Sequence, residues 1–317
     1  HDGGPRGRHA VPGCRSAARR ERSPPLCTTE AGEPPPRGSV GRVTDSVTPR
    51  SPLRALWGAT HPGPTLVVTV LSLALGIATG VDPWRLAVLV AAVFAGQVSV
   101  GLSNDAIDGA RDAAVGRTDK PIAGGAVTPE RALAVAVASA ILAVVLSLPL
   151  GPGLVAAHAV ALASAWAYNA GLKSTPVSIA PFVLSFGLFP SFATLSLSPP
   201  MLAAWWASLA GAALGAAVHL TNVVRDLDDD RRTGVRGLPH RLGARRSVVL
   251  AAVGIAAGAL AVFFGTDATA LGVAFFVAVL ALAVGAAVLV FVRPPGRAVF
   301  QLTMLAALVL TAQLVAA

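Results

Sequence analysis

Residues 102–125 read LSNDAIDGARDAAVGRTDKPIAGG, and residues 220–243 read LTNVVRDLDDDRRTGVRGLPHRLG. The second segment repeats the first at a constant offset, since Asn222 stands 118 residues after Asn104 and the other shared positions keep that spacing. An Asn-x3-Asp-x3-Asp spacing places its three side chains on one face of a helix. The repeat therefore predicts two related halves, each with acidic residues where a helix ends. The shared polar and turn residues are Asn104 and Asn222, Asp108 and Asp226, Asp112 and Asp230, Gly116 and Gly234, Pro121 and Pro239, and Gly125 and Gly243.

The composition indicates a membrane protein. Of the 317 residues, 54% are hydrophobic and only 13% are charged, and the mean hydropathy is +0.67. A soluble domain of this length does not need so much apolar side chain. A helix needs about 20 apolar residues to cross a bilayer, which predicts an all-α integral membrane protein with nine transmembrane helices. The predicted spans are 56–80, 84–103, 129–149, 154–170, 177–197, 201–222, 247–264, 269–292 and 298–316.

Residues 1–52 differ in composition from the rest of the chain. They contain nine proline and nine arginine residues and no long apolar run. This composition predicts a disordered basic tail, followed by a membrane domain over residues 53–317. Both cysteines, Cys14 and Cys27, lie in the tail. The membrane domain therefore has neither a disulfide nor a cysteine metal site.

The net charge of +9 follows the predicted topology. Lysine and arginine residues of the membrane domain lie in the loops after the second, fourth, sixth and eighth spans, and the opposite loops hold only Arg85. This positive-inside pattern predicts a multi-pass protein of the plasma membrane, with the N-terminus and both acidic motifs in the cytoplasm. Because the charge is explained by topology, we expect membrane lipids as partners and no nucleic acid.

The two acidic motifs suggest a metal and phosphate site. Carboxylates crowded together without partners repel one another, and hard divalent cations relieve that repulsion. Mg²⁺ typically takes one or two carboxylates and fills its remaining positions with water and phosphate oxygens. Arginine and lysine residues next to the acids suit the remaining phosphate charge. Acid, metal and base together predict a diphosphate site at the membrane edge, and an isoprenyl diphosphate would place its lipid tail in the membrane below.

The motifs then resemble a known family. The first is similar to the first signature of the UbiA superfamily of intramembrane prenyltransferases, and the second is similar to its second signature. Between them, residues 168–173 read YNAGLK, which resembles the Tyr…Lys loop that follows the fourth span in this family. Lys120 stands where many members have arginine. The segments that carry the resemblance are Asn104 to Asp112 with Arg117 to Pro121, and Asn222 to Gly234 with Leu238 to Gly243.

The resemblance implies nine helices around a central cavity, capped by two Asp-rich cytoplasmic loops. It implies transfer of a polyprenyl group from an isoprenyl diphosphate to an aromatic, quinone-precursor-like, or other lipophilic acceptor. The cofactor is expected to be Mg²⁺, with Mn²⁺ as the alternative ion. The predicted metal residues are Asn104, Asp105, Asp108, Asp112, Asn222, Asp226 and Asp230, with Asp108 and Asp226 as the catalytic pair. The predicted diphosphate residues are Arg117, Lys120, Lys173, Arg225 and Tyr168.

Two other functions fit a polytopic membrane protein. A transporter would carry ionisable residues within its spans, along a water-filled route. Here the acidic residues gather at the ends of two spans on one face of the membrane. A non-catalytic prenyl-lipid-binding protein could lose the acidic residues, which this chain retains. The transferase is therefore the leading hypothesis, and its acceptor stays open.

Overall fold

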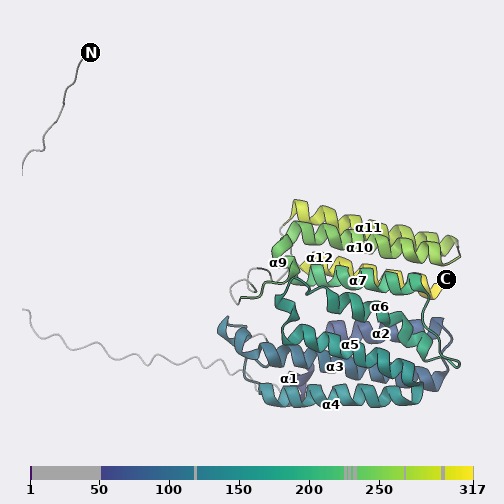
Figure 1. Ribbon diagram of the computed structural model, residues 1–317, viewed down its shortest axis with the longest axis horizontal. Coiled ribbons are helices and arrows are strands. Elements are labelled where there is room, and N and C mark those ends of the chain that lie inside the picture. Colours follow the sequence, from purple (N-terminus) through teal and green to yellow (C-terminus); the bar gives the residue numbers. More distant parts are fainter. Residues whose placement is uncertain are drawn as a thin grey trace, which may run out of the picture. The chain divides into compact units, whose positions relative to one another are not determined.

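The computed structural model describes His1 and residues 51–117, 120–224, 227, 230, 234–267, 269–293 and 297–316. Most of the predicted tail lies outside these residues, and so do Arg225 and Asp226 of the second motif. Every regular element in the described part is a helix, and the long helices run side by side (Figure 1). They are α1 Pro52–Ala59, α2 Pro62–Ala78, α3 Pro83–Ala114, α4 Pro129–Ser147, α5 Pro152–Ala170, α6 Ala180–Leu195, α7 Trp205–Val224, α9 Leu238–Leu242, α10 Ala244–Gly265, α11 Ala270–Val292 and α12 Arg297–Ala316, with 3-10 turns η1 Leu148–Leu150 and η2 Leu172–Ser174.

Eight of the nine predicted spans each overlap one α-helix of the described part, whereas the predicted span 56–80 runs across the break between α1 and α2. By length and composition, five of these helices can cross a membrane, or six if the bent pair α1–α2 forms one span. Helix α6 and residues Arg297–Gln313 of α12 are also apolar, but each is shorter than the 18 residues required of a spanning helix. The protein is thus an all-helical, multi-pass membrane protein, and the number of nine crossings stays a prediction.

Proline begins many of these helices. Pro52, Pro62, Pro83, Pro129 and Pro152 each occupy the first position of a helix. Proline suits this position because the missing N–H would have no partner within the helix. Between α1 and α2 the chain bends by 66° at Thr60 and His61. This bend brings the N-terminal end of α2 to the acidic end of α3.

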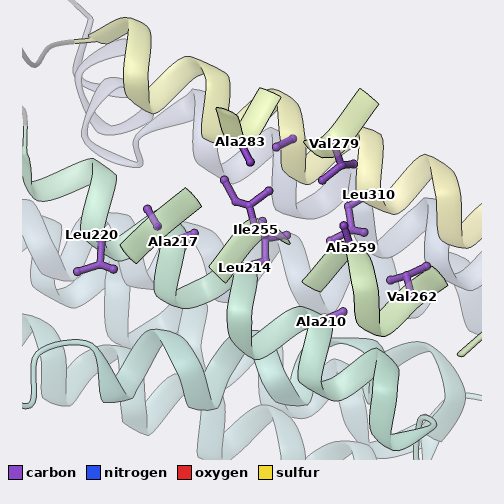
Figure 2. Close-up of a cluster of buried hydrophobic side chains, with 12 residues drawn as sticks. Ala210, Leu214, Ala217, Leu220, Ile255, Ala259, Val262, Val279, Ala283 and Leu310 are labelled. Carbon is purple, nitrogen blue, oxygen red and sulfur yellow. The ribbon is translucent and has the colours of Figure 1, made fainter. Parts of the chain in front are cut away.

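Small residues allow the second motif's helix to pack closely. A side chain at Gly211 or Gly215 of α7 would collide with backbone carbonyls of α6. Such a small-x3-small pattern permits close approach of helices in lipid. On its other side α7 packs against α10 and α12, and α11 packs against these two helices, around a buried cluster (Figure 2). The cluster is Ala210, Leu214, Ala217, Leu220, Ala251, Ile255, Ala259, Val262, Val279, Ala283, Ala306 and Leu310.

Candidate functional site

One cavity of about 690 Å³ receives side chains from α2, α3, α5, α6, α7 and α12. Its polar end contains every predicted site residue that the structure describes. Its remaining wall is apolar and aromatic, and includes Phe182, Phe186, Phe189 and Phe192. The cavity therefore joins a charged end to a hydrocarbon-like interior. The predicted site residues that line it are Asn104, Asp105, Asp108, Asp112, Arg117, Lys120, Tyr168, Lys173, Asn222 and Asp230.

The first motif lies on a helix. Asn104 to Asp112 form the last turns of α3, which ends at Ala114. The helical position predicted from their spacing is thus confirmed, whereas the Asp-rich loop implied by the family resemblance is wrong for these residues. Asp105, Asp108 and Asp112 are buried, with exposed fractions of 2%, 5% and 7%. Their spacing keeps the three carboxylates on the cavity side of α3. Cationic side chains neutralise their negative charge.

Cationic side chains pair with all three carboxylates. Lys120 Nζ lies 3.0 Å from Asp105 Oδ1 and 2.9 Å from Asp112 Oδ2. Arg111 donates to Asp108 Oδ2 at 2.7 Å, and the Lys173 ammonium donates to Asp108 Oδ1. In the free protein, these cationic side chains relieve the repulsion between the carboxylates of the motif. Three cationic side chains already balance three carboxylates.

The two lysines of this network differ in proton affinity. Burial lowers the pKa of Lys120, but Asp105 and Asp112 outweigh burial and hold the pKa above the ordinary lysine value. Burial also lowers the pKa of Lys173; Asp108 opposes this only in part, and nearby Arg111 and Lys120 add to the lowering. Lys120 is thus firmly charged, whereas the charge of Lys173 depends more on its surroundings. Perturbed groups of this kind are typical of functional sites.

His61 is a site residue that the sequence analysis missed. Its Nε2 lies 3.0 Å from Asp105 Oδ1, the same oxygen that Lys120 contacts. Its backbone is left-handed, with φ 55°, which is uncommon for a residue other than glycine. The strained residue occupies the bend between α1 and α2 and holds its ring at the polar end of the cavity. The sequence signal was the run His61-Pro62-Gly63-Pro64, which predicts a break in the helix.

The second motif borders the same cavity as the first. Asn222 at the end of α7, Asp230 and Pro239 line it, as do their repeat partners Asn104, Asp112 and Pro121. Asp230 Oδ2 is 3.2 Å from His240 Nε2, a contact within the loop that leads through α9. The structure therefore brings described residues of both copies together. The predicted residues Arg225 and Asp226, and the neighbouring Asp228 and Asp229, lie outside the described residues.

Tyr168 and its neighbours mark the boundary between the charged and apolar parts. Tyr168 lines the cavity at the end of α5 and meets Phe182 edge-on, at 5.1 Å between ring centroids. The ring of His219 lies 5.7 Å from Tyr168, and its Nε2 is 3.1 Å from Ser178 Oγ. This cluster ties the ends of α5, α6 and α7 together beside Lys173.

The donor set fits a divalent ion by its chemistry. Asp105, Asp108, Asp112 and Asn104 offer the oxygen ligands that Mg²⁺ prefers. Within the described residues, no three His, Cys, Asp or Glu side chains converge to form a metal cage. Mg²⁺ does not require such a cage, because it usually combines one or two carboxylates with phosphate oxygens of a substrate. A metal–diphosphate complex is therefore compatible with this end of the cavity.

Comparisons with known proteins agree on one family. A model of the UbiA prenyltransferase family matches residues 65–309. A 4-hydroxybenzoate octaprenyltransferase of Escherichia fergusonii is 34% identical over 168 residues, which are 51% of this chain and 58% of that protein. A digeranylgeranylglyceryl phosphate synthase of Methanoregula boonei is 30% identical over 212 residues, which are 63% of this chain and 72% of that protein. The match thus spans little more than half the length of the first relative.

The fold also has a solved counterpart. The structure of a UbiA homolog from Archaeoglobus fulgidus bound to GPP and Mg²⁺ superposes with a TM-score of 0.64. The alignment covers 83% of this chain and 100% of that one, at 14% sequence identity. At this identity the likeness establishes a shared fold.

Proposed function

The chain belongs to the UbiA prenyltransferase family, and from this premise we propose that it transfers a polyprenyl group from an isoprenyl diphosphate to an aromatic or other lipophilic acceptor. The observation that carries the proposal is the cavity, which joins a charged end to an apolar interior. The charged end suits a diphosphate, and the apolar interior suits an isoprenoid chain.

The cationic side chains are proposed to hold the diphosphate. Lys120 and Lys173 now bond carboxylates of the first motif, and an arriving diphosphate would compete for these bonds. Its negative charge would favour the charged form of Lys173, whose pKa is lowered in the free protein. The same role is proposed for Arg117, Arg225 and Tyr168. Bidentate and charge-assisted hydrogen bonds make such contacts strong.

The acidic residues are proposed to hold Mg²⁺, with Mn²⁺ as the alternative ion. When bound with the diphosphate, the ion would supply positive charge against which the leaving group departs. Asp108 and Asp226 are proposed as the catalytic pair, one from each motif. The further residues proposed for the metal are Asn104, Asp105, Asp112, Asn222 and Asp230.

The apolar wall is proposed to protect the reacting carbon. Cleavage of the allylic C–O bond leaves an allylic cation, which water would quench. Phe182, Phe186 and Phe189 line the interior and keep water away from this carbon. The acceptor's nucleophilic atom then forms the new bond to the prenyl group and releases a proton.

The relatives leave two kinds of acceptor open. One is named as a 4-hydroxybenzoate octaprenyltransferase and another as a digeranylgeranylglyceryl phosphate synthase. We propose an aromatic acceptor first, since a ring can pack against the aromatic wall of the cavity.

The test of the proposed function is incubation of membranes containing the protein with labelled geranylgeranyl or longer prenyl diphosphate, Mg²⁺ and a panel of acceptors. Labelled lipid products that require this protein would support the proposal, and their absence with every acceptor would overturn it.

We further propose that the protein lies in the plasma membrane with both motifs in the cytoplasm. After replacement of Cys14 and Cys27, Ala114→Cys and Arg236→Cys should react with an impermeant thiol reagent only from the cytoplasmic side. Asp267→Cys should react only from the outside. The one-sided lysine and arginine distribution carries this expectation, and all three positions are exposed in the structure. Labelling of positions 114 and 236 from opposite sides would contradict a shared site.

A further inference from the structure

Two polar side chains lie in the apolar part of the cavity, away from the carboxylates. Gln97 of α3 and His158 of α5 both line it, among Val93, Leu162 and Phe192. An α-helix rises about 1.5 Å per residue, so Gln97 lies about 10 Å from Asn104 along α3. Neither side chain takes part in the ion pairs of the first motif.

Hydrogen bonding fixes the tautomer of His158. Ser147 Oγ donates its one proton to the carbonyl of Ala143 at 2.8 Å. The same Oγ lies 3.0 Å from His158 Nδ1, so Nδ1 must carry the proton and donate it to Oγ. The imidazole is only 4% exposed and lies among apolar side chains, which disfavours a second proton. Nε2 is therefore a hydrogen-bond acceptor.

This acceptor nitrogen lies against α3. A methyl group built on Gly96 would come within 2.7 Å of His158 Nε2, so glycine at this position lets the ring edge reach α3 next to Gln97. Within the described part of the chain, Nε2 forms no hydrogen bond, and the Gln97 amide forms none either. The pair presents one acceptor nitrogen together with an amide that can both donate and accept. His158 is buried and Gln97 is half-buried against the cavity. Buried polar groups normally have partners, so a ligand with matching groups would be stabilised here.

We propose that Gln97 and His158 bind a hydroxyl group of the acceptor substrate. The hydroxyl donates its proton to Nε2 of His158, and its oxygen accepts from the amide of Gln97. A carboxylate has no proton to give to Nε2, and a hydrocarbon chain would leave both side chains without partners. The inference rests on the proposed function and narrows it to hydroxylated acceptors.

The position of the pair suits an acceptor that reacts near the diphosphate. Reacting atoms in a productive complex are about 3 Å apart. Gln97 lies about 10 Å from the first motif along α3. This distance is long enough for one acceptor ring together with the gap of about 3 Å between the ring and the reacting prenyl carbon. The prenyl chain then extends along the walls formed by Phe186, Phe189 and the α2 residues Val67 and Val68.

The test compares two probes of nearly the same shape, phenol and toluene, on the purified full-length protein with geranyl diphosphate and Mg²⁺. Phenol should raise the thermal unfolding temperature of the wild type more than toluene does. Gln97→Leu and His158→Leu should each remove this difference. Ser72→Ala should keep it, because Ser72 is a buried hydroxyl that bonds its own helix at Thr69, outside the cavity. With 4-hydroxybenzoate as acceptor, both cavity variants should raise the acceptor KM about tenfold and leave the KM for prenyl diphosphate unchanged.

Equal responses to phenol and toluene in the wild type would overturn the subsite, as would a phenol preference that survives Gln97→Leu. If His158→Leu does not fold, the response of Gln97→Leu to phenol and toluene alone tests the subsite. This variant should fold, because Gln97 has no hydrogen bond to lose within the described residues. A retained, Gln97-dependent phenol preference in a protein that transfers no prenyl group would support the subsite while overturning the proposed function.

Discussion

Asp108→Asn should lower the rate of prenyl transfer by orders of magnitude. Asp108 is buried at the polar end of the cavity and bonds both Lys173 and Arg111. The substitution keeps the shape of the side chain but removes the negative charge proposed to hold the metal with the diphosphate. Loss of support for the leaving group removes stabilisation that is strongest in the transition state. Initial rates at saturating prenyl diphosphate measure the effect.

Loss of a buried charge also affects folding, and a second variant separates the two effects. Removing one member of a buried ion pair leaves the other uncompensated, which costs about 3–5 kcal/mol when the pair is fully buried. Asp108→Asn combined with Arg111→Met removes one charge of each sign from this ion pair and leaves the proposed diphosphate residues in place. We expect the double variant to recover thermal stability relative to Asp108→Asn and to remain inactive. Recovery of activity together with stability would show that Asp108 only supports the fold.

The second motif provides a companion test. Asp226→Asn should reduce transfer as strongly as Asp108→Asn if both motifs hold one diphosphate. The double variant Asp108→Asn with Asp226→Asn should then be hardly worse than either single variant, because residues acting as one unit are not additive. Asp267→Asn on the opposite face should have no effect. Independent, multiplicative losses would mean that the motifs serve separate sites.

Much of the candidate site was predictable because helical periodicity is a local property. Spacings of four residues placed Asn104, Asp108 and Asp112 on one face, and all three line the cavity. The constant offset between the motifs likewise predicted that Asn222 and Asp230 would join them there. The apolar segments predicted the helices to within a few residues at most ends.

The pairing of charges was not predictable in the same way. Whether Lys120 bonds Asp105 or a ligand depends on how the chain returns after α3, which no local pattern encodes. His61 reaches Asp105 only because the chain bends between α1 and α2. The Arg111–Asp108 pair did have a local signal, since residues three apart are neighbours on a helix. The helical spacing of the motif correctly predicted that Asn104 to Asp112 lie on a helix, whereas the Asp-rich loop was expected only from the family resemblance.

Removal of divalent metal should abolish transfer without unfolding the protein. An excess of chelator should reduce product to background, and added Mg²⁺ or Mn²⁺ should restore it, because departure of the diphosphate needs additional positive charge. The fold does not need the ion in the same way. Lys120, Lys173 and Arg111 already neutralise the three carboxylates of the first motif, so the thermal unfolding temperature should stay within a degree or so of its original value.

The transfer rate and the thermal unfolding temperature together distinguish a catalytic role of the metal from a structural one. A structural ion contributes its binding free energy to folding, so that chelators lower the stability of proteins which depend on one. The ion pairs of Lys120 with Asp105 and Asp112 make such dependence unnecessary here. Prenyl diphosphate with Mg²⁺ should raise the unfolding temperature, since a ligand that binds only the folded state stabilises it, and chelator should cancel that increase. Full turnover in excess chelator would refute the proposed metal role, and a fall in unfolding temperature without substrate would assign the ion to the fold instead.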